Sequence, residues 1–253
     1  MAKKDDTEKY GEEVGWDNPD SAKELAKPAK LKGGNRTFRF YLPQPKDGEP
    51  TETYATFLTQ EPVFIREHNV KIDGRYGNQF TCLSGSGEEC PLCAAGDEPY
   101  AAWAFLVVDH SEWVDKKGTE HKDEVKLFVA KQRTAKELKT QHAKRKGLAG
   151  CMFQARRTDE FSPSVGDKFD FEIKVTAKQL KAGGVGVPID DEKTRETGPF
   201  DIKSQTVYLQ TIKDELAPKP VATLERAARG EKPSRDTDAT AEIADEELDD
   251  IAF

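Results

Sequence analysis

The chain has 253 residues, enough for one substantial domain or two small ones with a core that needs no disulfides. Charged residues make up 34% of it, against about 25% in typical globular domains, so part of the chain should be solvated. No apolar run reaches the ~18–20 residues of a membrane span, and no secretory signal opens the chain, which predicts a cytoplasmic protein with reduced cysteines. The net charge of −8, taken alone, argues against a nucleic-acid-binding protein.

The distribution of charge argues the other way. Residues 1–27 carry a net charge of −3 and residues 230–253 carry −7, which leaves +2 for the body between them. Within that body, residues 131–157 hold nine Lys or Arg side chains and the single acid Glu137. An acidic tail beside a strongly basic segment indicates a surface that binds a polyanion.

Periodicity divides the chain into an arm, a body and a tail. Residues 1–33 are polar and broken by Pro and Gly, which predicts a flexible arm. Several runs in the body alternate between apolar and polar residues or are rich in β-forming residues. In chain order, strands are predicted at 36–42, 103–109, 124–130, 150–157, 168–175 and 206–212.

Two helices are predicted among these runs. One begins at the capping box formed by Thr134 and Glu137 and ends at Gly147; a shorter one runs from Pro220 to Arg229. Short strands with one intervening helix predict a mainly β (α+β) protein, and an OB-fold barrel rather than a doubly wound sheet. We therefore expect an OB-fold core at 34–215, enlarged by a subdomain at about 63–100, and then a short helix and a disordered acidic tail at 216–253.

Four residues in that subdomain have the chemistry of a metal site. Cys90 and Cys93 form a C-x-x-C pair, Cys82 precedes them across a Ser-Gly-Ser-Gly stretch, and His68 lies further upstream. Three thiolates and one imidazole make the closed tetrahedral shell of structural Zn²⁺. The alternatives are a redox pair or buried thiols, and no βαβ pattern supports the redox reading. Cys151 is expected to be a core thiol.

A catalytic zinc site is a further alternative. Zinc deaminases place a glutamate two residues after the histidine, where this chain has Val70, and a proline before the cysteine pair, whereas Pro91 lies inside it. Four protein ligands would also leave no position for a reactive water. We therefore expect a protein that is not an enzyme. A zinc-dependent nucleic-acid enzyme and a zinc-stabilised protein-interaction module remain the rival hypotheses.

The motifs together resemble a known family. The run from Thr37 to Pro43, then His68, Cys82, Cys90-Pro91-Leu92-Cys93 and Gly96-Asp97-x-Pro99 are similar to phage single-stranded DNA-binding proteins of the gene-32, helix-destabilising type. The resemblance implies an OB-fold, a zinc subdomain with His68, Cys82, Cys90 and Cys93 as ligands, and sequence-independent binding of single-stranded DNA. It also implies a role in phage replication, recombination and repair, in the cytoplasm of the infected bacterial host. The chain departs from the family in its acidic amino terminus, where the gene-32 type has a basic self-association arm.

The last five residues, Asp249-Asp250-Ile251-Ala252-Phe253, resemble the acidic tip of bacterial single-stranded DNA-binding proteins. In that group the tip recruits partners, which implies that polymerase, helicase, primase or recombinase binds here. A flexible acidic string can find a basic surface, and a terminal Phe can fill an apolar pocket. The partner contacts are therefore predicted at Asp249, Asp250, Ile251 and Phe253; the alternative is a tail that only solubilises.

Single strands are held by cations along the phosphates and by aromatic rings beneath the bases. Arg39 and Tyr41 share one face of their predicted strand, and Lys126 and Phe128 share a face of theirs, so these four are candidate DNA contacts. The predicted phosphate contacts are Lys131, Arg133, Lys139, Lys144, Arg145, Lys146, Arg156 and Arg157. For each cation the alternative is a solvated side chain, and for each aromatic residue it is core packing.

Overall fold

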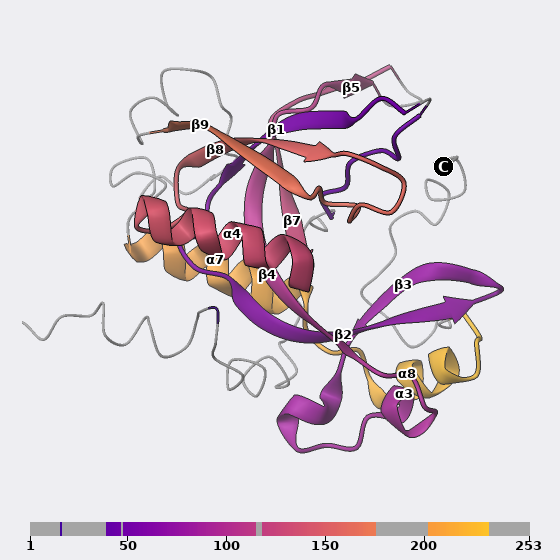
Figure 1. The fold of residues 1–253 in the computed structure, drawn as a ribbon. Coiled ribbons are helices and arrows are strands. Elements are labelled where there is room, and N and C mark those ends of the chain that lie inside the picture. The colour runs from indigo at the N-terminus through magenta and orange to yellow at the C-terminus, as the bar shows by residue number, and fades with distance from the viewer. Residues whose placement is uncertain (1–15, 17–38, 47, 115–117, 176–201, 233–253) are drawn as a thin grey trace, which may run out of the picture. The chain divides into compact units, whose positions relative to one another are not determined.

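A computed structural model describes residues 16, 39–46, 48–114, 118–175 and 202–232. Their elements, shown in Figure 1, are β1 (Thr51–Phe57), β2 (Val63–Ile72), β3 (Arg75–Thr81), the 3-10 helix η1 (Leu83–Ser86), α3 (Pro91–Ala94), β4 (Tyr100–Asp109), β5 (Trp113–Val114), β6 (Glu120–His121), β7 (Glu124–Lys131), α4 (Gln132–Arg145), β8 (Cys151–Arg157), β9 (Lys168–Lys174), α7 (Ile202–Glu215) and α8 (Val221–Ala228). The protein is mainly β, as predicted.

These elements form two compact units. Among the described residues, unit 1 comprises 16, 39–46, 48–64, 102–114, 118–175 and 202–212, and unit 2 comprises 65–101 and 213–232. The chain passes between the units inside β2, inside β4 and near the end of α7.

Unit 1 is built on an antiparallel sheet in the order β7-β4-β1-β8-β9. Alternate side chains of its strands point into the core, and several of these are phenylalanines. Phe57 lies at the centre, with its ring centroid 5.3 Å from that of Phe105, 5.4 Å from Phe128 and 5.6 Å from Phe153. All four rings are fully buried, and each contributes roughly 1.5–3 kcal/mol by burial. The four predicted strands from 103–109 to 168–175 are confirmed as β4, β7, β8 and β9.

The strand predicted at 36–42 is wrong for its described residues. Arg39 makes an isolated parallel bridge to Leu127, and the next residues form no ladder. The amide of Phe40 donates to the Leu127 carbonyl at 2.9 Å, whereas the amide of Leu42 donates to Ser164 at 2.7 Å. The segment therefore divides its hydrogen bonds between β7 and the loop before β9. The sheet is not closed into a barrel by strand pairing, because β7 and β9 share no ladder in the described residues.

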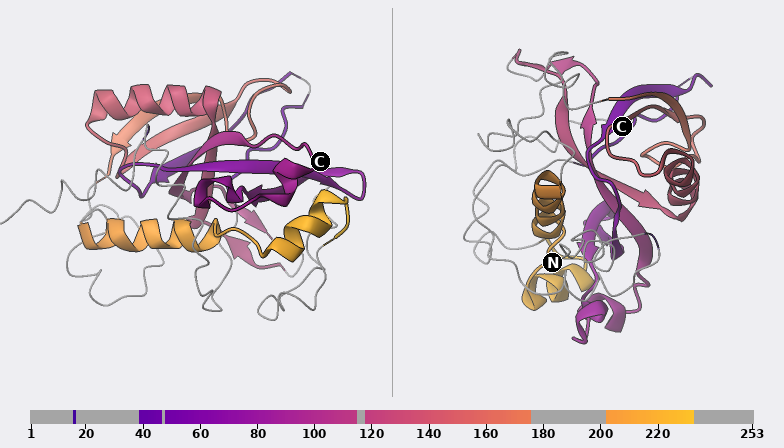
Figure 2. Two further views of the ribbon diagram at one scale, coloured as in Figure 1. Left: turned by 90° about the horizontal axis from the view of Figure 1, so that it is seen from below. Right: turned by 90° about the vertical axis from the view of Figure 1, so that its left-hand side faces the viewer.

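Helices α4 and α7 lie on opposite sides of the strands of unit 1 (Figure 2). The capping box predicted for α4 is wrong, because β7 leads directly into the helix at Gln132 and Lys131 is the N-cap. Thr134 is buried inside the first turn, where its hydroxyl donates to the Gly166 carbonyl at 2.9 Å. Thr134 therefore fastens α4 to the loop before β9.

The strand predicted at 206–212 is also wrong, because these residues belong to α7. The side chain of Gln205 fixes the helix to the segment after β1. Its amide nitrogen donates to the Leu58 carbonyl at 2.7 Å, and its oxygen accepts from the Gln60 amide at 2.8 Å. Leu209 and Ile212, one turn apart, are buried. Burial of one face of this helix against the rest of unit 1 therefore outweighs the β propensity of Thr206 and its neighbours.

Trp16 is buried in unit 1, with its indole centroid 5.7 Å from the Phe105 ring and 5.8 Å from the His142 ring. Its carbonyl accepts a hydrogen bond of 2.9 Å from the indole nitrogen of Trp103. The rest of the predicted arm at 1–33 lies outside the described residues.

Unit 2 consists of the hairpin β2–β3, then η1, α3 and α8. The hairpin turns at Asp73 and Gly74, whose φ angles of 50° and 82° are those of a type I′ turn. One face of the hairpin packs against Leu92 of α3 and Leu224 of α8. The helix predicted at 220–229 is confirmed as α8. In the part of the chain that is described, no helix is long and apolar enough to cross a membrane.

Candidate metal centre and nucleic-acid interface

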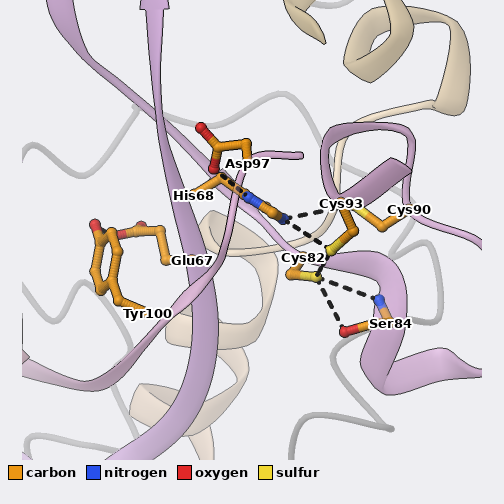
Figure 3. A network of polar contacts seen from close by, with 8 residues as sticks. All are labelled: Glu67, His68, Cys82, Ser84, Cys90, Cys93, Asp97 and Tyr100. Carbon is orange, nitrogen blue, oxygen red and sulfur yellow. Dashed lines mark hydrogen bonds and ion pairs between the residues drawn. The ribbon is translucent and has the colours of Figure 1, made fainter. Parts of the chain in front are cut away.

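Unit 2 brings the four predicted metal ligands together (Figure 3). His68 lies on β2, Cys82 follows β3, Cys90 is the N-cap of α3, and Cys93 lies within α3. One ligand atom from each lies within 4.8 Å of all the others. This convergence depends on the hairpin, which returns β3 alongside β2, and on α3, which places two thiols on one helical turn.

The spacing fits a tetrahedral ion. The Nε2 atom of His68 lies 3.5 Å from the sulfur of Cys90 and 3.6 Å from that of Cys93, and the sulfurs of Cys82 and Cys93 are 3.5 Å apart. Zinc–sulfur bonds of about 2.3 Å in tetrahedral geometry place ligand atoms roughly 3.5–3.8 Å apart. The donor set and its size therefore suit a metal ion, and zinc is consistent with both.

Asp97 orients the histidine of this cluster. Its Oδ1 lies 2.7 Å from Nδ1 of His68, so Nδ1 carries the proton and Nε2 faces the sulfurs. The left-handed Gly96, at φ 87°, turns the chain after α3, and the Asp97 amide donates to the Leu92 carbonyl at 3.0 Å. A carboxylate behind a ligating imidazole is the usual support of a metal site.

The acid–base behaviour of the metal-free cluster follows from the proximity of its members. Burial opposes ionisation of the Cys82 thiol, but hydrogen bonds from His68 and Ser84 outweigh it and lower the pKa to about 6. Burial also opposes protonation of His68, yet its hydrogen bonds to Cys82 and Asp97 raise its pKa to about 9. Burial and the neighbouring thiols raise the pKa of Cys93 to about 12. The cluster thus holds protons that a bound cation would displace.

Replacing Asp97 with asparagine should weaken metal binding without removing a ligand. The amide keeps the side-chain shape but lacks the charge that supports the His68 imidazole, and loss of such a partner costs about 10–100-fold in metal affinity. Competition with a chromogenic chelator measures the change. Glu98→Gln, a neighbouring carboxylate outside the cluster, is the matched control, and equal affinities for both variants would contradict the role of Asp97.

Cys151 lies apart from the cluster, in the core of unit 1, as predicted. It is fully buried, and its sulfur lies 3.6 Å from the Gly147 carbonyl. Burial raises the pKa of its thiol, which keeps it protonated. It therefore has the character of a packing residue.

The predicted phosphate contacts divide into two groups. Those on the outer side of α4 and at its ends are exposed: Lys131, Arg133, Lys139, Lys144 and Lys146, to which the structure adds Lys136. Of these, Arg133 also pairs with Asp167 at 3.0 Å. The other three are partly buried and engaged within unit 1. The Arg145 guanidinium lies 3.6 Å from the Phe171 ring centroid, Arg156 pairs with Glu52 at 3.1 Å, and Arg157 donates to the Leu42 carbonyl at 3.3 Å.

The structure argues against two of the predicted strand contacts. Lys126 and Phe128 do share a face of β7, but it is the inner one. The Phe128 ring is fully buried and cannot stack on a base. The Lys126 ammonium pairs with Asp109 at 2.7 Å, and only 16% of its side chain is exposed. Tyr41 is 46% exposed and Arg39 is half-buried, so both remain candidates.

The structure also exposes aromatic rings that the sequence patterns did not single out. Tyr54, Tyr76, Trp113 and Phe161 are 42%, 71%, 44% and 85% exposed. Trp113 stacks on His121 at 4.0 Å between centroids. The exposure of Tyr76 had one sequence signal: its neighbours on both sides are charged, polar or glycine. A tyrosine in a core is more often flanked by apolar residues.

A hydroxyl, an imidazole and a carboxylate also lie in a row in unit 1. Oγ1 of Thr56 is 2.8 Å from Nε2 of His110, whose Nδ1 is 2.5 Å from Asp123. Nucleophilic catalysis uses these residue types in this order. Thr56 is only 1% exposed, however, so its hydroxyl cannot meet a substrate in this conformation. The row links β1 to the end of β4, and we assign it a structural role.

The predicted partner contacts at Asp249, Asp250, Ile251 and Phe253 lie outside the described residues. Comparison with known proteins adds nothing to the site, since neither a family model nor a curated protein matches the chain.

Proposed function

We propose that this chain is a sequence-independent single-stranded DNA-binding protein of the phage gene-32 type, acting in replication, recombination and repair. In this proposal unit 1 is an OB-fold and unit 2 its zinc-stabilised subdomain. Two features support the fold: a five-strand antiparallel order with one helix between β7 and β8, and the segment at 39–42, which hydrogen-bonds β7 and the loop before β9.

The observation that carries the proposal is the outer surface of α4. Its inner face, formed by Thr134, Ala135, Leu138 and Gln141, is buried. The helix holds five Lys or Arg residues and the single acid Glu137, for a net charge of +4. Cations in its last turn also stabilise the helix dipole, but that effect does not require those in the first two turns. Binding of a polyanionic nucleic-acid strand would explain why cations lie along the whole outer surface of α4.

The test is a titration with oligo-dT at several salt concentrations. Six exposed cations lie in the 131–146 segment: Lys131, Arg133, Lys136, Lys139, Lys144 and Lys146. With about 0.7 counterions released per phosphate contact, six contacts predict a log–log slope of roughly −4. The absence of affinity at low salt would reject the proposal. A duplex of the same length should bind more weakly, since its bases are not available for stacking.

The same titration separates the rival functions. A zinc-stabilised protein-interaction module would bind a partner protein and show no salt-dependent affinity for single strands. A zinc-dependent nucleic-acid enzyme would alter the oligonucleotide, which gel analysis after the titration would reveal. Four protein ligands would leave a zinc ion no open position, which favours a structural role for the metal.

We further propose that the acidic tail recruits replication and recombination proteins and competes with DNA for the basic surface. Residues 233–253 carry a net charge of −7. Deleting them should therefore raise the affinity for oligo-dT several-fold at low salt, with a smaller gain at high salt because screening weakens the competition. Fluorescence anisotropy with both chains measures the change. Unchanged binding at every salt concentration would remove the competition from the proposal.

A further inference from the structure

The hairpin β2–β3 of unit 2 has one covered face and one open face. His68, Val70 and Phe80 point toward the metal cluster and α8, where they are buried. Asn69 and Gln79 are opposite each other in the strand register and lie on the other face, where they are only partly buried. We call this other face the hairpin face: Asn69, Lys71, Tyr76 and Gln79, with Arg75 exposed at its edge next to the turn, where it pairs in register with Ile72.

A large aromatic ring stands on this face. Tyr76 is 71% exposed, more than Tyr41 and Tyr54, the other exposed tyrosines among the described residues. The register shifts between Val70 and Ile72, and the irregularity is held by a hydrogen bond of 2.9 Å from the Gly77 amide to the Asn69 side chain. Gly77 has a φ of 115° and open space where a Cβ would be. A glycine at such a point leaves room for a ligand to approach the backbone.

The charge around the ring is positive. The Lys71 ammonium lies 5.8 Å from the Tyr76 ring centroid, and Arg75, the residue before Tyr76 in the chain, is exposed. The acid at the turn, Asp73, lies 3.5 Å from the Lys232 ammonium. Within the described residues, neither Lys71 nor Arg75 forms an ion pair with an acidic side chain.

We infer that the hairpin face is a second contact for single-stranded nucleic acid, with a base stacked on Tyr76 and its flanking phosphates bound by Lys71 and Arg75. The cations select a polyanion, and the exposed ring selects a polyanion with accessible bases, which a duplex does not offer. The inference rests on the proposed function and adds to it a site on unit 2, separate from the α4 surface on unit 1.

Three variants test the site by oligo-dT titration at several salt concentrations. Tyr76→Ala should weaken binding about 5- to 150-fold, the range for loss of one stacked base, and leave the salt slope unchanged because no charge is lost. Tyr76→Phe keeps the ring and should bind like the parent chain. Lys71→Ala with Arg75→Ala should make the slope less steep by about 1.4, for two lost phosphate contacts.

Crosslinking gives a direct readout in the unaltered protein. An oligonucleotide with 5-iodouracil should crosslink on irradiation to the peptide that contains Tyr76, identified by mass spectrometry. Metal content is measured for every variant, so a loss of fold in unit 2 would be detected, and the crosslink decides the question if Tyr76→Ala does not fold.

The outcomes separate this inference from the proposed function. If the parent chain does not bind single strands, both fail. If it binds and substitutions on α4 weaken it, but Tyr76→Ala binds normally and no crosslink falls on residues 65–81, only the inference is overturned. It is equally overturned if Tyr76→Ala binds DNA normally and loses affinity for a protein partner, because the hairpin face would then be a protein-docking surface.

Discussion

Replacing Cys90 with serine is expected to abolish stoichiometric metal binding and to unfold unit 2. Among the described residues, the hydrophobic cluster that joins the hairpin, α3 and α8 has nine buried members, and two of them, Cys82 and Cys90, are themselves ligands. Structural zinc contributes about 10–16 kcal/mol in small zinc-finger peptides, as much as the whole net stability of a typical domain. Elemental analysis should give about one zinc per parent chain and none in the variant. Limited proteolysis should then cut within residues 65–101.

The matched control is Cys151→Ser. It removes an equally buried thiol from unit 1, so it should lower stability modestly and leave the metal content unchanged. In the Cys90→Ser variant, unit 1 should stay folded because its phenylalanine core includes none of the ligands. A Cys90→Ser chain that keeps one tightly bound zinc, with unit 2 resistant to protease, would contradict the assignment of the ligands.

The metal cluster could be predicted from the sequence because its geometry is largely local. Cys90 and Cys93 share a helical turn, and a short hairpin returns Cys82 to His68, so spacing and residue type carry most of the information. The packing of α8 against the same cluster could not be predicted. Leu224 is 131 residues away from Cys93 in the sequence, and no pattern within α8 states which surface its apolar stripe will cover.

The wrong predictions have a common physical origin: a sequence pattern reports local periodicity, whereas the burial of each side chain depends on tertiary contacts. The β-rich run at 124–130 correctly predicted a strand, but it did not distinguish the inner face from the outer, and Phe128 is in the core. The run at 206–212 is rich in β-formers, yet Gln205 and the buried Ile212 hold it as a helix. Tyr76 could not be singled out from the sequence, because the exposure of its ring follows from tertiary structure.

Removing three charges from α4 is expected to weaken single-strand binding strongly while leaving the fold intact. Lys136, Lys139 and Lys144 are exposed, and glutamine is a good helix former, so the triple Lys→Gln variant should melt close to the parent chain. Each lost phosphate contact should make the log–log salt slope less steep by about 0.7, or about 2 for three. At 0.15 M salt, the same relation predicts an affinity loss of about 50-fold.

The charge change needs its own control, because any loss of three positive charges makes the chain more acidic. Lys46, Lys168 and Lys219 are also exposed and lie outside α4, so their triple Lys→Gln variant has the same net charge. If the α4 surface binds the phosphates, only the α4 variant should have a lower affinity for oligo-dT and a less steep salt slope. Equal losses in both variants would mean that the overall field attracts DNA without a defined track on α4. A salt slope in the α4 variant as steep as that of the parent chain would place the phosphate contacts elsewhere on the protein.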